Sequence, residues 1–121
     1  YHPYDYYAGN YNNETNEIKL NHVYNAPSTV QVQIKKVEIV NEYDPKNKIT
    51  LELISTVDQS VSISLLCSQS NDNLAYGDRK EIVLTAKEPE TVELTFGGWK
   101  DFSYWIDISV DNTRINLRIE P

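Results

Sequence analysis

Few side chains in this 121-residue chain could act as a nucleophile or as a general base. The chain has two histidines, His2 and His22, and one cysteine, Cys67. Nucleophilic catalysis needs a nucleophile, a base and a group that orients the base. His2 lies in a polar N-terminal segment, and His22 lies near the end of an expected strand. Cys67 alternates in phase with Val61 and Ile63, which predicts a small buried side chain and not a reactive thiol. We therefore expect no catalytic residue.

The 18 acidic residues are the next candidates, because a glycosidase uses two facing carboxylates. With so many acids some pair must lie close together, so closeness alone indicates little. Most of them fall in turns or at the ends of expected strands, where charged side chains discourage pairing between sheet edges. Examples are Asp44, Asp58, Glu88, Glu90 and Asp111. The sequence therefore predicts a protein that is not an enzyme.

The segment 71–73, Asn-Asp-Asn, together with Asp78, carries oxygen atoms of the kind that calcium binds. It lacks the twelve-residue spacing and the terminal glutamate of an EF-hand. Plain turns have the same composition. The four glycines also lack the spacing of a phosphate-binding loop. We expect no metal ion and no cofactor.

An aromatic cluster spans Trp99, Phe102, Tyr104 and Trp105. Phe102 and Tyr104 alternate in phase with Ile106, which predicts that both pack in the core. Trp99 and Trp105 fall outside that phase. Large aromatic rings mostly serve packing, but exposed flat rings also bind sugars. Carbohydrate contact through the two tryptophans therefore stays open as an alternative.

The elements that must position these residues are strands. Isoleucine, valine, threonine and aromatic residues are abundant and favour strands, whereas methionine is absent. Apolar and polar residues alternate, and no segment has helical periodicity of useful length. Turn signals recur about every ten residues, which is typical of two packed antiparallel sheets. The expected strands cover residues 18–24, 29–40, 49–57, 61–67, 82–86, 92–96, 102–110 and 115–119.

Three local signals refine this pattern. The alternation slips at Lys35-Lys36, which predicts a β-bulge. Asp44-Pro45-Lys46-Asn47 has the composition of a turn. Asp111-Asn112 suits a two-residue hairpin turn, because both residue types tolerate positive φ.

Residues 1–17 differ from the rest, since they are rich in tyrosine and asparagine and lack valine, isoleucine and leucine. We expect them to form a flexible arm or linker before a domain that covers residues 18–121. Asn13-Glu14-Thr15 in this arm is an N-glycosylation sequon, so Asn13 is a candidate glycosylation site in an exported chain. Because the chain does not begin with methionine, a removed leader or an absent N-terminal membrane helix is plausible.

Charge and cysteine content limit the kinds of partner and the cellular compartments that fit this chain. Eleven basic and 18 acidic residues give a net charge of −7, which disfavours binding to nucleic acid or to anionic membrane surfaces. A single cysteine excludes an intrachain disulfide. This fits a reducing cytosol, and it also fits an exported protein that does not use disulfides.

Residues 88–120 resemble the last three strands of immunoglobulin-like domains: the segment Glu90 to Phe96, a Gly-Gly loop, the segment Tyr104 to Val110, the Asp111-Asn112 turn and a final strand. More narrowly, they are similar to the disulfide-free CARDB-like and archaeal envelope versions of that fold. The Tyr-, Asn- and Ile-rich composition also resembles the soluble domains of archaellum stator proteins, the FlaF and FlaG families.

These resemblances imply an immunoglobulin-like antiparallel β-sandwich of seven or eight strands. They also imply an extracytoplasmic domain that is anchored by a membrane segment outside this sequence and contacts a surface-layer protein. The alternatives are a pilus-like filament subunit and a carbohydrate-binding module.

The long strand 29–40 exceeds its neighbours in length and is expected to project past the core. If Ile39 pairs with Ile49 and Val37 with Leu51, the four side chains share one apolar face. Such a face predicts a partner surface and a homodimer. The opposing interpretation is that the bulge bends the strand back, so that the four residues complete the core.

Overall fold

The structure, a computed structural model, describes residues 6–25, 29–40, 42–69, 75–98, 102–111 and 113–121. These residues form nine strands and no helix. Among them there is thus no helix with the length and apolar character of a membrane span. The strands are β1 (Tyr6–Asn12), β2 (Val23–Asn25), β3 (Val30–Glu38), β4 (Glu42–Ser55), β5 (Gln59–Gln69), β6 (Ala75–Leu84), β7 (Glu90–Gly98), β8 (Tyr104–Val110) and β9 (Thr113–Glu120).

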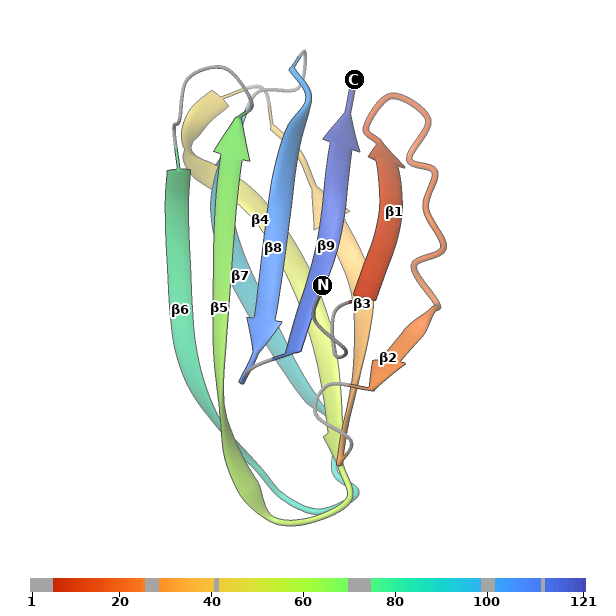
Figure 1. Cartoon of the computed structure of the whole chain (residues 1–121), viewed down its shortest axis with the longest axis vertical. Coiled ribbons are helices and arrows are strands. Elements are labelled where there is room, and N and C mark those ends of the chain that lie inside the picture. The colour runs from red at the N-terminus through yellow and green to blue at the C-terminus, as the bar shows by residue number, and fades with distance from the viewer. Residues whose placement is uncertain (1–5, 26–28, 41, 70–74, 99–101, 112) are drawn as a thin grey trace.

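The strands form two sheets that pack face to face (Figure 1). One sheet has five strands in the order β1-β9-β8-β5-β6, and the other has four in the order β2-β3-β4-β7. All neighbouring strands are antiparallel except β1 and β9, which are parallel. The expected all-β, immunoglobulin-like sandwich is confirmed, with nine strands in place of seven or eight.

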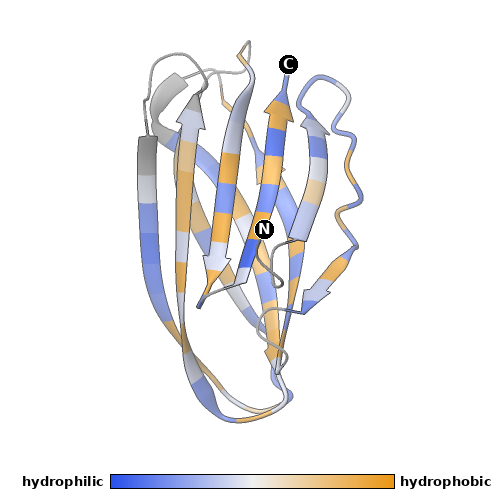
Figure 2. Ribbon diagram, viewed as in Figure 1, coloured by the Kyte–Doolittle hydropathy of each residue, from blue (hydrophilic) through white to orange (hydrophobic). Residues whose placement is uncertain are grey.

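The core forms between the inner faces of the two sheets, because alternate side chains of each strand point inward. Figure 2 shows this alternation of hydrophilic and hydrophobic residues along β8 and β9. The largest buried side chains include Phe96 from β7 and Tyr104 from β8, whose ring centroids lie 6.0 Å apart in a tilted arrangement. The predicted inward direction of Tyr104 is confirmed, whereas Phe102 precedes β8 and is exposed.

Two local predictions in the β3–β4 hairpin have different outcomes. The bulge at Lys35-Lys36 is confirmed, since the register between β3 and β4 shifts between Ile34 and Lys36. The turn predicted at residues 44–47 is wrong, because β4 already begins at Glu42. Asn47 is buried there, and its Oδ1 accepts a hydrogen bond of 2.7 Å from the backbone N–H of Val40. The register of β4 against β7 shifts between Glu42 and Asn47, so the residues expected to turn lie in an irregular part of the strand.

The segment expected to be an arm is largely part of the sandwich. β1 pairs in parallel with β9 from Tyr6 opposite Ile115 to Asn12 opposite Glu120. Tyr11 is only 3% exposed. The single proton of its hydroxyl lies within donating reach of two acceptors, Asn16 Oδ1 and the backbone oxygen of Val37. The expectation of a flexible arm is therefore corrected for residues 6–12, because tyrosine rings supply the apolar surface that aliphatic residues supply elsewhere.

Most other boundaries differ in extent only. The strand expected at 18–24 is reduced to β2, and residues 18–22 connect β1 to β2. The strand expected from residue 82 begins at Ala75, so the end of the predicted loop is strand. The candidate calcium segment 71–73 lies outside the described residues.

Candidate functional site

The residues that could have acted as nucleophile and base do not come together. Cys67 is buried in β5, and its thiol donates a hydrogen bond of 2.7 Å to the backbone oxygen of Gly97. Burial raises the pKa of Cys67 to about 12, so the thiol stays protonated near neutral pH. His22 is exposed and directly precedes β2, which belongs to the other sheet than β5. His2 lies outside the described residues. Within the described ranges no group of three histidine, cysteine, aspartate or glutamate side chains is placed to hold a metal ion.

Of the two tryptophans predicted as possible sugar contacts, the structure describes Trp105 alone. Trp99 lies outside the described residues. Trp105 is half-buried on the outer face of β8, and the Arg118 guanidinium carbon lies 4.8 Å from its ring centroid. Arg118 is opposite Trp105 in the β8–β9 register, which explains the contact. A cation over the ring occupies a face that a sugar would need.

The predicted partner surface does not exist in the form expected. The register places Val37 opposite Ile49, and Leu51 opposite Ile34. Val37, Ile49 and Leu51 are buried in the core, and Ile39 packs partly buried against it. The bulge at Lys36 shifts the pairing by one residue and turns the strand onto the core. The interface prediction for these four residues is therefore corrected in favour of the opposing interpretation.

The sequon lies in the turn that follows β1. The backbone N–H of Asn13 donates a hydrogen bond of 2.9 Å to the Glu120 oxygen, and its side chain is half-buried. The Asn12 Oδ1 accepts hydrogen bonds from the backbone N–H groups of Glu14 and Thr15. Glycosylation of Asn13 stays a prediction.

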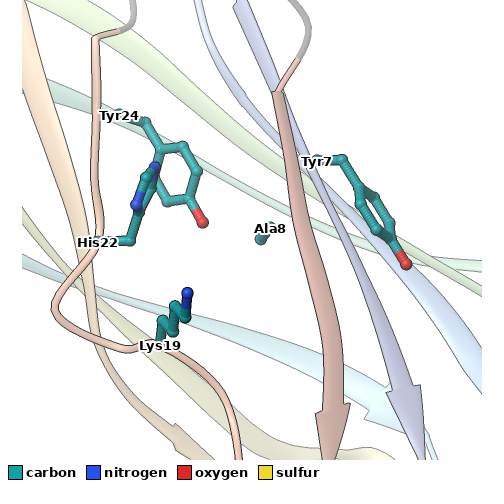
Figure 3. A pocket seen from close by; sticks show the side chains of 5 residues that line it. All are labelled: Tyr7, Ala8, Lys19, His22 and Tyr24. Carbon is teal, nitrogen blue, oxygen red and sulfur yellow. The ribbon is translucent and has the colours of Figure 1, made fainter.

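A pocket with polar and charged walls lies between β1 and the segment that leads into β2. We call it the β1–β2 pocket. Its volume is about 220 Å³, and Tyr7, Ala8, Lys19, His22 and Tyr24 line it. Figure 3 shows Lys19, His22 and Tyr24 on one side of the hollow and Ala8 on the other, with the Tyr24 hydroxyl directed into it. The Tyr7 side chain lies on the far side of β1 and points away from Ala8 (Figure 3).

The β1 wall of the pocket is shaped by an irregularity in strand pairing. The register of β1 against β9 shifts between Tyr7 and Gly9, so Ala8 is an extra residue. Gly9 has a φ of 102°, which side-chain-bearing residues rarely adopt. The short side chain of Ala8 leaves space where a larger residue would fill the hollow.

Residues 18–22 form the opposite wall, and every second residue of the segment 18–20 packs against the core. Ile18 and Leu20 pack partly buried against the core, whereas Lys19 between them is exposed. The Leu20 N–H donates to the Ile18 oxygen at 2.9 Å, and the His22 N–H donates to the Lys19 oxygen at 3.1 Å. These tight turns orient Lys19 and His22 toward the same hollow.

Aromatic contacts fix Tyr24 at the back of the pocket. Its ring lies edge-on to His22, with centroids 4.6 Å apart, and tilted against Tyr6 at 5.8 Å. Tyr6 in turn donates a hydrogen bond of 2.7 Å to the backbone oxygen of Asn25. Burial raises the pKa of Tyr24, so its hydroxyl remains a hydrogen-bond donor at neutral pH. This arrangement can bind a ligand, because Lys19, His22 and the Tyr24 hydroxyl offer polar groups held in fixed positions around one hollow.

Comparison with known proteins adds no assignment, since no family model matches the sequence and no similar curated protein is found. A function for this chain therefore has to be inferred from its own sequence and geometry. Sequence reasoning missed Lys19 and Tyr24. The alternation of Ile18, Lys19 and Leu20 signals that Lys19 points away from the core, but only the placement of β1 shows what it faces.

Proposed function

We propose that this chain is a non-enzymatic protein-interaction domain that works outside the cytoplasm and binds its partner along the edge strand β6. The observation that carries the proposal is the length and exposure of this edge. β6 has ten residues, and among the described strands it pairs with β5 alone (Figure 1). A free edge of this length offers backbone donors and acceptors to an added strand.

The other sheet edges are shorter or covered within the described residues. The edge of β7 is covered by β6 side chains: Asp78 accepts a hydrogen bond from the Thr95 N–H at 2.8 Å, and Lys80 donates one of 2.5 Å to the Glu93 oxygen. β2 has only three residues. The edge of β1 ends in a bridge between Asn12 and Glu17. These coverings support β6 as the edge that a partner meets.

The side chains on the outer face of β6 define what such a partner must carry. Arg79 and Glu81 are exposed and belong to no ion pair within the described residues, and Val83 is 74% exposed. Figure 2 shows the hydrophilic character of this strand. Charges on an edge strand oppose indiscriminate pairing. A specific partner strand therefore places an acid opposite Arg79 and a base opposite Glu81, because opposite charges across two strands attract.

A second copy of the chain satisfies this charge requirement and is our second candidate partner. Antiparallel pairing of two β6 strands around Lys80 places Arg79 of each copy opposite Glu81 of the other. Lys80 of each copy is drawn to its own Glu93 carbonyl, which reduces repulsion at the centre of the pair. This relationship supports the expected homodimer, at a different surface from the one that the sequence suggested.

For the compartment and the family, the proposal follows two resemblances, that of residues 88–120 to CARDB-like and archaeal envelope domains and that of the Tyr-, Asn- and Ile-rich composition to archaellum stator domains. We propose an archaellum stator component that contacts a surface-layer protein, anchored by a segment outside this sequence. The sandwich fold and the absence of any possible intrachain disulfide are compatible with it. A pilus-like filament subunit is less well supported, because β1 is already paired within its own sheet. Sugar binding at Trp105 competes with Arg118 for the ring.

The first test measures binding to a surface-layer protein. We expect purified surface-layer protein to bind the wild-type chain and to bind Arg79→Glu about tenfold more weakly. Lys35→Glu, which makes the same charge change on β3, should bind like the wild type. Equal binding by Arg79→Glu, or no binding by the wild type, would contradict the proposal for this partner.

The homodimer is tested separately by sedimentation. We expect twice the 14.0 kDa mass of one chain for the wild type, one chain mass for Arg79→Glu, and restored dimer for the double swap Arg79→Glu with Glu81→Arg. The double swap keeps a self-complementary strand but loses complementarity to a different partner. A monomeric wild type, or a dimer unaffected by Arg79→Glu, would exclude pairing through β6.

A further inference from the structure

We infer that the β1–β2 pocket binds a small organic carboxylate of about monosaccharide size. This binding is independent of the edge strand and of the function proposed for it. The pocket combines a cation, an imidazole and a tyrosine hydroxyl around one hollow. Each of these features points to an anion that accepts hydrogen bonds.

The charge of the lining is opposite to that of the whole chain. The chain carries a net charge of −7, yet the ionisable side chains that face the hollow are Lys19, His22 and Tyr24, with no carboxylate among the described lining residues. Lys19 makes no ion pair with any described residue. A local cationic site in an acidic protein favours a single negative charge, because a dianion such as phosphate meets stronger repulsion from the remaining acids.

The Tyr24 hydroxyl is the uncharged donor of the pocket. The residue as a whole is only 4% exposed, and its hydroxyl is directed into the hollow (Figure 3). Its oxygen is not one of the buried polar atoms that lack a hydrogen-bond partner, so the hollow leaves it accessible to a ligand. A carboxylate offers two oxygens with several acceptor positions, so it can accept from Tyr24 and from Lys19 at the same time.

The size of the ligand follows from the volume of the pocket. About 220 Å³ is the space of roughly seven waters at about 30 Å³ each. The ring of Tyr24 gives the ligand an apolar wall, and the short Ala8 side chain leaves the opposite wall open. A carboxylate on a six-membered ring matches this combination of volume, wall and donors.

The test uses glucuronate as the probe, with glucose and the methyl ester of glucuronate as neutral matches. In a ¹⁵N-correlated NMR titration of the whole chain, we expect glucuronate to shift the amide resonances of Ala8, Lys19, His22 and Tyr24. Both neutral probes should leave them unchanged. No shift with glucuronate overturns the inference, and equal shifts with glucose overturn the role of the charge.

Two variants assign the contacts. Tyr24→Phe keeps the ring and removes the hydroxyl, and it should weaken glucuronate binding about fivefold. Lys19→Gln should weaken it about three- to fivefold, as expected for an exposed ion pair. Lys87→Gln removes the same charge in the β6–β7 turn and should bind like the wild type. If Lys19→Gln and Lys87→Gln weaken binding equally, the attraction is not local and the assigned site is wrong.

Discussion

The Asp78 carboxylate in β6 accepts a hydrogen bond of 2.8 Å from the backbone N–H of Thr95 in β7, although the two strands belong to different sheets. The same oxygen accepts from the Thr95 hydroxyl at 3.2 Å, and the other carboxylate oxygen accepts from the Arg79 N–H. Together with Lys80, this side chain therefore covers the edge of the four-stranded sheet and ties the two sheets together on this side of the sandwich.

Asp78→Ala should lower the free energy of unfolding by about 1–3 kcal/mol, because it leaves the Thr95 N–H without its charged acceptor. Urea denaturation followed by tryptophan fluorescence measures this loss. Asp78→Asn retains one acceptor oxygen and should lose less than Asp78→Ala. If both variants unfold at the wild-type urea concentration, the edge is not closed by this side chain.

Tyr11→Ala should lower the free energy of unfolding by about 3 kcal/mol, because a buried aromatic ring is removed from the core. Tyr7→Ala is the matched control on the same strand, since Tyr7 is 60% exposed, and it should change the stability by less than about 0.5 kcal/mol. Equal, small effects of the two variants would mean that β1 does not contribute to the core.

Ile49→Lys should prevent stable folding, because it places an unpaired charge at a position with 0% exposure. Ile39→Lys should be tolerated much better, since Ile39 is only partly buried and the lysine ammonium can reach water. Circular dichroism and thermal melting distinguish the two variants. If the Ile49→Lys protein stayed folded and only changed from dimer to monomer, the interface interpretation would be restored.

The raised pKa of Cys67 predicts a loss of stability at alkaline pH. Below about pH 9 the thiol is protonated in both the folded and the unfolded chain, so it adds no pH dependence. Between about pH 9 and the folded-state pKa of about 12, the unfolded chain loses the proton and the folded chain keeps it. The unfolded state is then favoured by up to about 1.4 kcal/mol per pH unit.

Urea titrations at pH 8 and pH 10.5 measure this slope, and Cys67→Ala should reduce it. Tyrosines with raised pKa values, among them Tyr11 and Tyr24, supply the slope that remains in the variant. The native thiol should also resist thiol-specific reagents at pH 8 and react once the chain is unfolded. Rapid reaction of the native protein would show that Cys67 is accessible.

The strands with regular alternation of apolar and polar residues were predictable from the sequence. In such strands every second side chain points into the core, so the alternation indicates directly which residues are buried. The bulge was predictable for the same reason, since the slip in phase at Lys35-Lys36 is local. β1 was not predictable in this way, because it has no alternating aliphatic residues and its partner β9 is about a hundred residues away. The pocket depends on that same pairing, so Lys19 and Tyr24 could not be placed together from local pattern.

The parallel pairing of β1 with β9 has a mechanical consequence. Tyr6 and Ile115 lie at one end of the pair, and Asn12 and Glu120 lie at the other. Tension applied between Tyr6 and Glu120 pulls the two strands past each other, along their length. Interstrand hydrogen bonds run across the strands, so the whole ladder is loaded in shear at once and cannot open one bond at a time. Resistance to force is governed by the unfolding rate, and this geometry places a high barrier on the line between these two residues.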